Sequence, residues 1–501
     1  MTDPACYRVP LERYPGMSRF VLDWLNGDER FLKRGGQPPP AVRHLDSTLI
    51  DALIASNKRW GIDAASDLRR WAAGGTQTIV AGQQVGFGGG PLYTLVKIAS
   101  LLKMKRDNES RGIPTTVFFW LATEDHDFAE VATLALPNRD EHRQRDLLYL
   151  RATNGDSRAV VGRLPIPEVL AEELTRTLGI ERPKWLRPGI TFGDSFAELV
   201  ASIAGSGLIL VDSLLPEMRR AGAPLFNAIM SRWSEIQTAI ASRSAELERA
   251  GYAPQVVARP GESYTLLYNI NGDGDRELIQ SPARIASPES ISTSALTRPL
   301  LQEFVFQPDV FIGGPAEISY YAQIAPLHPL LGLRMPRLAL RAHMLIAARK
   351  IVRYLSRFSI PPEEIFNPPE AIAASLAQRG VADIKRIATE AEAQLNQQIE
   401  NIREMALPAD HAVARAINRS IGHIEYHFRK LTERSIRGPV RKDRERFQAA
   451  RELASTFYPD QHVQDRIVAW LPWWYEYREQ LLDRMVNEAE PDAAAFKIVG
   501  L

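Results

Sequence analysis

The sequence has a single cysteine among its 501 residues, Cys6, which excludes an internal disulfide framework and a thiolate metal cluster. It has no run of about 18 apolar residues, so no membrane-spanning helix is predicted. The first residues lack the charged-then-apolar pattern of a secretion signal. Neither sign of charge dominates, because 61 Lys and Arg balance 60 Asp and Glu. We therefore expect a cytoplasmic protein with no nucleic-acid or membrane partner.

The most informative stretch joins an apolar strand, at residues 78–81, to a helix that begins at Pro91. The segment 82–90 holds five glycines, and glycine lets a ligand approach the main chain. Proline is favoured in the first turn of a helix, where free N–H groups attract anions. The spacing fits neither a Walker loop nor the dinucleotide fingerprint. It predicts a phosphate or carboxylate site, with a tight turn as the structural alternative. The binding candidates are Gly82, Gln83, Gln84, Gly86, Gly90, Tyr93 and Lys97.

Four ionisable residues follow a second apolar strand, predicted at residues 115–121. Strand, helix and strand form one βαβ unit, so these residues should project from the sheet edge beside the glycine loop. Such groups act as a general base, recognise an amine or hydroxyl, or bind magnesium, whereas helix capping is the structural alternative. No second histidine pairs convincingly with His126, so zinc is under-supported and no metal ligands are assigned. The catalytic candidates are Glu124, Asp125, His126 and Asp127.

A second junction of strand, glycines and proline lies at residues 309–315. Two such junctions are expected where a parallel sheet exposes its carboxyl edge to a ligand. Arginine suits bidentate recognition of carboxylate or phosphate, although a structural salt bridge is an equal alternative for Arg298. The binding candidates here are Arg298, Gln302, Gly313, Gly314, Glu317, Tyr320 and Gln323, with Gln255 as a weaker one.

Two β-hairpins are predicted as small insertions, because turn residues separate pairs of apolar segments. The turns are Asn-Gly-Asp-Ser at 154–157 and Asn-Gly-Asp-Gly at 271–274. We also expect a strand at 207–211 and a long helical stretch at 216–250. The predicted strand pairs are 147–151 with 159–164 and 264–270 with 277–279.

The character of the sequence changes after about residue 365, where apolar residues step by three and four in 384–402 and 413–431. This predicts an antiparallel helical hairpin with a narrow apolar seam. If Leu395 faces a partner chain, charging it yields monomers; if it packs within the hairpin, the same change destabilises the fold. The predicted domains are a core at 1–365, the hairpin at 366–455, and an aromatic-rich segment at 456–501 that docks on the core.

Together these blocks resemble the bacillithiol-synthesis cysteine-adding enzyme family, BshC. The small departures are Gly88-Gly89, Ala316 and Tyr321, where the family often has other residues. The matching pieces are Ala81-Gly82-Gln83-Gln84-Val85-Gly86, Gly90-Pro91-Leu92-Tyr93-Thr94, Phe119-Trp120-Leu121-Ala122-Thr123-Glu124-Asp125-His126-Asp127-Phe128, Thr297-Arg298-Pro299 with Gln302, and Gly313-Gly314-Pro315 with Glu317, Ile318 and Tyr320-Tyr321-Ala322-Gln323.

The resemblance implies an α/β fold with a Rossmann-like, class I synthetase-like parallel-sheet core and an antiparallel coiled-coil domain. It also implies a homodimer. The implied reaction is amide formation between cysteine and the amine of malyl-glucosamine, which are the expected small-molecule substrates. Two alternatives stay open: a nucleotide-dependent ligase or transferase acting on another amino-sugar or amino acid, and a non-catalytic dimeric scaffold built around the hairpin.

A free carboxylate forms an amide poorly in water, because its oxygen is a poor leaving group. ATP with Mg²⁺ is the candidate activator, although the sequence leaves the energy source open. We expect residues 82–90 to cradle phosphates or the acyl group, and Asp125 and Asp127 to bind an ammonium or amine. His126 is the candidate proton acceptor. Glu317 and Arg298 would orient sugar hydroxyls and the malate carboxylate.

Overall fold

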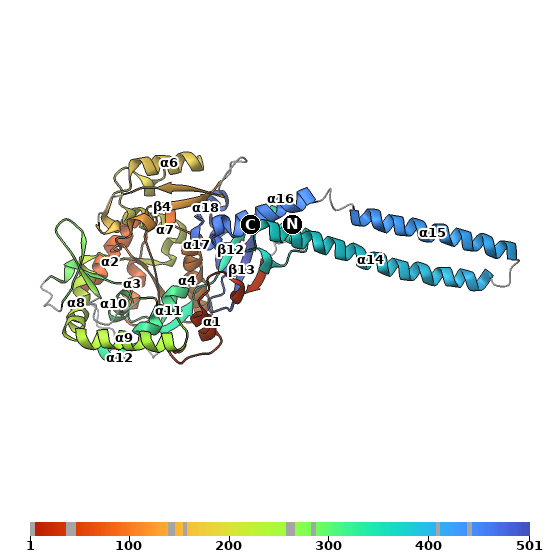
Figure 1. The fold of residues 1–501 in the computed structure, drawn as a ribbon. Coiled ribbons are helices and arrows are strands. Elements are labelled where there is room, and N and C mark those ends of the chain that lie inside the picture. The colour runs from red at the N-terminus through yellow and green to blue at the C-terminus, as the bar shows by residue number, and fades with distance from the viewer. Residues whose placement is uncertain are drawn as a thin grey trace. The chain divides into compact units, whose positions relative to one another are not determined.

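The chain folds into two compact units (Figure 1). The core unit comprises residues 6–346 and 462–499, and the helical unit comprises residues 347–461. The domain boundaries expected near residues 365 and 455 stay predictions. The computed structural model describes residues 6–36, 47–138, 146–153, 158–256, 266–281, 287–406, 411–437 and 443–501.

A five-stranded parallel sheet forms the centre of the core unit, in the order β11-β10-β2-β3-β6. The strands are almost entirely buried, as their continuous apolar runs predicted. The parallel-sheet prediction is therefore confirmed. The strands are β2 (Gln77–Gln83), β3 (Thr115–Leu121), β6 (Ile209–Asp212), β10 (Val310–Gly313) and β11 (Arg337–Leu340).

The strand order reverses between β2 and β10. From β2 the chain adds β3 and β6 on one side, and later adds β10 and β11 on the other. Helices that leave two neighbouring strands in opposite directions open a crevice at the carboxyl ends of those strands. The glycine loop after β2 and the Gly-Pro junction after β10 therefore flank the same crevice.

Helices follow both junctions as predicted, but one of them begins one residue later than expected. Pro91 is the N-cap, so the first helix begins at Leu92, whereas Pro315 is the first residue of its helix and Gly314 is its N-cap. The stretch expected at 216–250 breaks into two helices at Arg232. The core-unit helices are α1 (Arg19–Leu25), α2 (Ser47–Trp60), α3 (Ala65–Ala72), α4 (Leu92–Ser110), α5 (Phe128–Val131), α6 (Glu168–Leu178), α7 (Phe192–Ala204), α8 (Pro216–Ser231), α9 (Trp233–Arg249), α10 (Arg298–Phe306), α11 (Pro315–Ile324), α12 (Leu327–Leu331), α17 (Gln464–Ile467), α18 (Leu471–Tyr477) and α19 (Glu479–Glu488).

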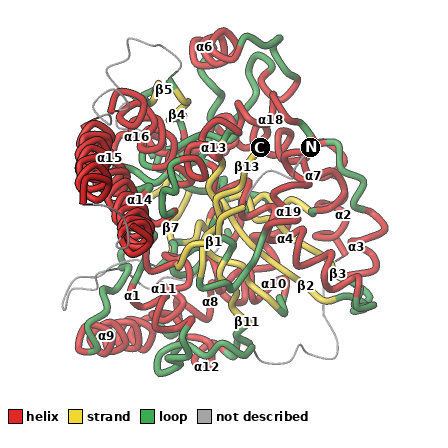
Figure 2. The backbone as a smooth tube through the Cα atoms, turned by 90° about the vertical axis from the view of Figure 1, so that its right-hand side faces the viewer, coloured by secondary structure: helices red, strands yellow, loops and turns green. Residues whose placement is uncertain are grey.

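Helices surround the strands of the sheet (Figure 2), and aromatic side chains hold helices against both of its faces. Successive residues of a strand point to opposite faces. Phe118 of β3 meets Trp71 of α3 and Phe306 of α10, with ring centroids 4.7 and 4.6 Å away. Its neighbour Phe119 stacks on Phe196 of α7, at 6.4 Å. The sheet is therefore covered on both sides, which leaves its carboxyl edge as the exposed rim.

One of the two predicted hairpins is present and the other is wrong. β7 (Leu267–Ile270) pairs antiparallel with β8 (Arg276–Leu278), and β9 (Ile291–Thr293) adds to β7. β5 (Leu147–Arg151) pairs instead with β4 (Thr133–Pro137), because that register buries Leu150 beside Leu134. The segment 159–164 forms a bridge from Ala159 to Asp275 and a 3-10 turn at Val161–Arg163 in place of a strand. The turn at 154–157 lies outside the described residues.

The end of the chain contributes to the core unit. β1 (Cys6–Pro10) pairs antiparallel with β13 (Ala495–Gly500), which also neighbours β12 (Met344–Ala347). The segment after residue 462 packs on the glycine loop: the Leu92 amide donates to the carbonyl of Val468 at 2.8 Å, and the Trp470 indole donates to the carbonyl of Gly89 at 3.1 Å.

The helical unit contains the predicted coiled coil. Its long helices α14 (Pro369–Ala406) and α15 (His411–Arg437) contact each other side by side, and the loop between them lies outside the described residues (Figure 1). Ile399 and Ile421 are buried in the seam, as their spacing predicted. Two shorter helices complete the unit, α13 (Arg349–Arg357) and α16 (Asp443–Phe457).

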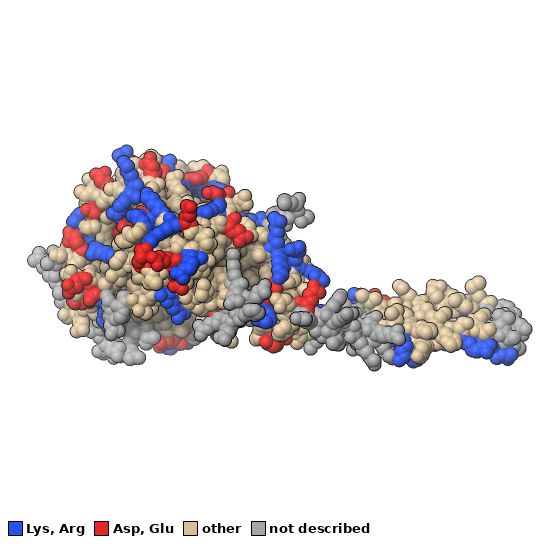
Figure 3. All heavy atoms as spheres, turned by 90° about the horizontal axis from the view of Figure 1, so that it is seen from above, with Lys and Arg blue, Asp and Glu red and all other residues tan. Residues whose placement is uncertain are grey.

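In the part of the chain that the structure describes, no helix is long and apolar enough to cross a membrane. Figure 3 shows Lys and Arg interspersed with Asp and Glu over the visible face of the core unit, in line with the balanced composition.

Candidate functional site

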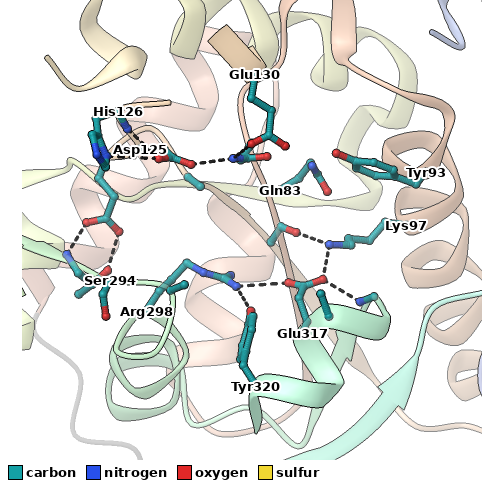
Figure 4. A pocket seen from close by; sticks show the side chains of 18 of the residues that line it. Gln83, Tyr93, Lys97, Asp125, His126, Glu130, Ser294, Arg298, Glu317 and Tyr320 are labelled. Carbon is teal, nitrogen blue, oxygen red and sulfur yellow. Dashed lines mark hydrogen bonds and ion pairs between the residues drawn. The ribbon is translucent and has the colours of Figure 1, made fainter. Parts of the chain in front are cut away.

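A cavity of about 780 Å³ lies at the carboxyl end of the central sheet. Residues that follow β2, β3 and β10 line this main cavity, including Gln83, Asp125 and Glu317 (Figure 4). The three sequence blocks therefore meet at one cavity. Its lining residues are Gly82, Gln83, Gln84, Tyr93, Lys97, Ala122, Glu124, Asp125, His126, Glu130, Tyr268, Arg276, Thr293, Ser294, Ala295, Arg298, Gly314, Pro315, Ala316, Glu317, Tyr320, Arg341 and Arg466.

A buried ion network crosses the floor of the main cavity (Figure 4). Lys97 Nζ donates to Glu317 Oε2 and to the carbonyl of Gly82, both at 2.6 Å. Arg298 Nη2 lies 3.3 Å from Glu317 Oε1 and also donates to the hydroxyl of Tyr320. Glu317 can reach both cations because it occupies the first turn of α11, where it also accepts the Gly314 amide at 2.7 Å. The network ties together the helices that follow β2 and β10.

Burial and pairing act in opposite directions on the pKa values of this network. Burial lowers the pKa of Lys97, and Glu317 opposes that shift only in part. Burial alone would raise the pKa of Glu317, but Lys97 and Arg298 hold it below its usual value. Glu317 is therefore a carboxylate at neutral pH, and its charge supports both buried cations. Arg298 forms a salt bridge with Glu317, which is the structural alternative that the sequence left open.

An acidic wall stands opposite this floor. The Gln84 side-chain amide donates to Asp125 Oδ2 at 2.7 Å and to Glu130 Oε2 at 2.9 Å. Burial raises the pKa of Glu130, and the Asp127 and Asp125 charges add to that rise. Two carboxylates bridged by one amide offer a seat for an ammonium group or an amine. Glu130 was not among the residues predicted from the sequence, although its position in the α5 turn that follows the acidic block was an available signal.

His126 is held by an arginine from a distant hairpin. Arg276 of β8 contacts the His126 Nδ1 at 3.0 Å. A guanidinium only donates hydrogen bonds, so Nδ1 must accept and the neutral ring carries its proton on Nε2. Burial lowers the pKa of His126, Arg276 and Arg158 lower it further, and Asp125 and Asp127 oppose them. Arg276 also lies 3.9 Å above the ring of Tyr268, which fixes its guanidinium beside the cavity.

Glu124 lines the cavity, but its carboxylate is occupied by the protein. Its Oε2 accepts from Arg219, Ser292 and the Thr293 amide at 2.6, 2.9 and 2.7 Å, and its Oε1 accepts from the Thr293 hydroxyl at 2.7 Å. Burial would raise the pKa of Glu124, but Arg219 and Arg276 hold it below its usual value. Glu124 therefore anchors β9 and α8 beside the cavity.

Asp127 caps a helix, which is the structural alternative weighed for the acidic block. Its side chain accepts the Glu130 amide at the start of α5 at 3.0 Å, and it does not line the main cavity.

Several other predicted binding residues lie away from the main cavity. Gln323 is fully buried, and its side chain bonds to the backbone of residues 255 and 256 and to Ser244. Gln302 is fully buried beneath Gly82, and its side-chain amide has no hydrogen-bond partner among the described residues. Gly86 and Gly90 line a smaller, adjacent cavity. Neither Gln255 nor Gly313 lines the main cavity.

Two arginines that the sequence analysis missed complete the cavity wall. Arg341 follows β11 and donates to Asp465 at 3.2 Å, and Asp465 also accepts from the hydroxyl of Tyr14. Arg466 lies in α17, with its guanidinium 5.6 Å above the ring of Tyr14. It forms no ion pair with any residue that the structure describes. Arg466 therefore presents an available positive charge to the cavity.

The comparisons with known proteins agree with this architecture. The model of the bacillithiol biosynthesis BshC N-terminal Rossmann-like domain matches residues 29–285 and 282–342. The model of the BshC C-terminal coiled-coil domain matches residues 344–501.

Curated relatives match over most of their length, under the name "Putative cysteine ligase BshC". The protein from Koribacter versatilis is 31% identical over 97% of this chain and 98% of its own. Those from Solibacter usitatus and Exiguobacterium sibiricum are 29% and 27% identical, over 86% and 91% of this chain and 86% and 90% of their own. The chain belongs to the BshC family of bacillithiol biosynthesis proteins.

Proposed function

We propose that the protein is a cysteine ligase that joins cysteine to the amine of malyl-glucosamine in the last step of bacillithiol biosynthesis. The relatives' printed names support the ligase reaction and the bacillithiol pathway. The observation that carries the proposal is the main cavity, where an acidic wall faces a cationic floor. That arrangement suits two substrates that each carry a carboxylate and an amine. We place the reaction in the cytoplasm, where cysteine thiols stay reduced.

The cavity offers groups for both reacting partners. Asp125 would hold the attacking amine, and Glu130, which Gln84 bridges to Asp125, would bind the ammonium of the other substrate. Arg466 and the Arg298 guanidinium would attract carboxylates or phosphates. These groups position the reactants and balance developing charge without rearrangement, which is how a preorganised site accelerates a reaction.

ATP with Mg²⁺ is the proposed energy source, and it would supply the activated carboxyl that amide formation needs. The residues present fit such a group. Arg298 and Arg341 line the main cavity and offer anion contacts, and Mg²⁺ is commonly held by one or two carboxylates together with phosphates. In the described part of the chain, no three His, Cys, Asp or Glu side chains cluster as a metal site on their own.

The geometry favours a donor role for His126. The prediction from sequence was a proton acceptor, but Arg276 occupies Nδ1 and leaves a proton on Nε2. We propose that the Nε2–H donates a hydrogen bond to the carbonyl or leaving oxygen, and that the acidic wall receives the proton of the amine.

The assignment is tested by incubating the enzyme with cysteine, malyl-glucosamine and Mg-ATP and measuring the thiol product by mass spectrometry. Asp125→Asn and Gln83→Ala should reduce kcat/KM by about tenfold or more, since each removes a contact in the cavity. Asp67→Asn in α3, which loses only an exposed ion pair with Arg70, is the matched control.

Three outcomes separate the candidate functions. Product from malyl-glucosamine supports the proposal. Turnover only with another amino-sugar or amino acid would replace the substrate, and thiol profiling of a deletion strain would show the same. No calorimetric heat with ATP, cysteine or the sugar would favour a non-catalytic scaffold.

We propose that the protein is a homodimer held by its coiled coil. Apolar side chains of α14 and α15 remain exposed, including Ile387 at 57% and Leu431 at 61%, whereas Leu395 is half-buried. A second copy would cover the exposed residues. Ile387→Lys should therefore give a monomer by light scattering with little loss of stability, and an unchanged oligomeric state would refute the assignment. Arg386→Gln, at the neighbouring exposed position, is the control.

A further inference from the structure

A second cavity of about 260 Å³ adjoins the main cavity on the side of the glycine loop. The two cavities share a wall, so a ligand in one can contact a ligand in the other. The volume falls just below the range of about 300–1,000 Å³ of drug-sized ligand pockets, which suits a ligand the size of an amino acid. The residues common to both cavities are Gln83, Gln84, Tyr93, Glu130 and Arg466.

One polar group inside the second cavity lacks a partner. Thr94 is 1% exposed, and its hydroxyl has no hydrogen-bond partner among the residues that the structure describes. Burying a hydroxyl without a hydrogen-bond partner costs free energy, so a ligand or water is expected to form that hydrogen bond. A Cβ at Gly90 would stand 3.5 Å from this hydroxyl, so the glycine keeps the approach to Thr94 open. The hydroxyl also lies in the first turn of α4, where anions are favoured.

Charges of both signs stand at the shared wall. Arg466 lines both cavities and is not neutralised by its neighbour Asp465, which already accepts from Tyr14 and Arg341. Glu130 lines both cavities as well, and among the described residues its carboxylate accepts from the Gln84 amide alone. A guanidinium and a carboxylate at one rim match the carboxylate and ammonium of an α-amino acid.

One part of the second cavity is apolar. Val131, Ala135 and Ile467 line this part, and Thr133, Tyr149 and Arg151 line the cavity beside it. Ala135 is 2% exposed and belongs to a hydrophobic cluster with Leu147 and Val468, which closes the apolar part. A small apolar or thiol side chain fits against these three residues, whereas a longer one meets the cluster.

We propose that the second cavity is the seat of the amino acid substrate, a small zwitterion with a compact side chain, and that the main cavity receives the partner carrying the amine. That this amino acid is cysteine rests on the proposed function. Its carboxylate faces Arg466 and the Thr94 hydroxyl, its ammonium faces Glu130, and its side chain enters the apolar part. The carboxyl therefore stands at the wall that the two cavities share, where an amine in the main cavity can reach it.

The test is a set of substrate titrations on the full-length enzyme. Thr94→Val keeps the shape and removes the hydroxyl, so the KM for cysteine should rise about tenfold while those for malyl-glucosamine and ATP stay within about twofold. Ala135→Leu fills the apolar part and should raise the KM for cysteine at least as much. Thr175→Val in α6, whose hydroxyl bonds only to backbone carbonyls of its own helix, is the control and should change none of the three.

Calorimetry with cysteine alone keeps this assignment separate from the proposed reaction. If the wild type makes no thiol product but binds cysteine, and Thr94→Val and Ala135→Leu weaken that binding, the seat stands and the proposed ligase reaction falls. If both variants bind cysteine like the wild type while Asp125→Asn does not, the amino acid sits in the main cavity and the seat is refuted. Binding of inorganic phosphate to the wild type in competition with cysteine, lost in Thr94→Val, would support the shared anion contact. Binding of phosphate with no binding of cysteine, alanine or serine would overturn the proposal.

Discussion

Replacing Glu317 with glutamine should destabilise the core unit, because that carboxylate supports two buried cations. The Lys97 and Glu317 side chains are only 5% and 15% exposed, so solvent screens their interaction weakly. Glutamine keeps the shape but leaves Lys97 and Arg298 without a counter-charge. Breaking a buried ion pair by removing one partner costs about 3–5 kcal/mol. With a urea dependence of about 3 kcal/mol per M, this lowers the urea midpoint by about 1 M or more.

The loss should also depend on pH in a defined direction. Glu317 raises the pKa of Lys97 against the effect of burial, so its removal lowers that pKa further. Between the lowered pKa and the ordinary value of 10.5, the unfolded state then binds more protons than the folded state. Stability rises with pH in that window, with a limiting slope of about 1.4 kcal/mol per pH unit for one proton. The variant should therefore lose less relative to wild type at about pH 9 than at about pH 7.

Tryptophan fluorescence during urea unfolding measures this effect, since all nine tryptophans lie in the core unit. The matched control is Glu235→Gln, which removes an exposed partner of Arg232 and should leave the urea midpoint close to that of the wild type. If Glu317→Gln unfolds at the same urea concentration as this control, or if its deficit does not shrink as the pH rises, the buried network does not carry the stability assigned to it.

Three further changes test other parts of the site. Arg276→Gln should raise the pKa of His126, because the arginine charge lowers it, and should move the acid limb of the kcat/KM profile to higher pH. An unmoved limb would show that the titration of His126 does not cause it. Gly89→Ala should lower the free energy of unfolding by about 2–4 kcal/mol, because φ is +88° there and a Cβ would lie 2.3 Å from the Trp470 ring; wild-type stability would contradict that packing. Gln302→Met should raise stability by about 1 kcal/mol and leave every KM unchanged, since its amide has no partner among the described residues; a raised KM would instead show a ligand contact.

The parts of the fold that depend on local signals could be predicted from the sequence. Neighbouring residues determine the apolar runs of β2 and β3, and they also determine the glycine-proline junctions after β2 and β10. Their meeting at one crevice followed from the geometry of a parallel sheet. The partner of β5 was not predicted, because strand pairing depends on which register buries leucines and not on the turn alone.

The site residues that were missed come from segments far away in the sequence. Arg276 lies on a hairpin edge, and Arg341 and Arg466 lie in stretches where an arginine usually faces water. Nothing local marks them, since only the folded core brings them to the cavity. The role of Gln323 could not be predicted for the same reason. Its helical spacing matched Glu317 and Tyr320, but its side chain forms hydrogen bonds with the backbone of Val256.

The order of the elements along the chain also has a consequence for biosynthesis. Arg466 and the Trp470 contact to the glycine loop belong to residues 462–499, which leave the ribosome after the entire coiled coil. While α14 and α15 are being synthesised, the segment that covers the glycine loop has not yet been made, and the two cavities lack one wall. A nascent chain therefore lacks a complete pocket until residues 462–499 have been translated.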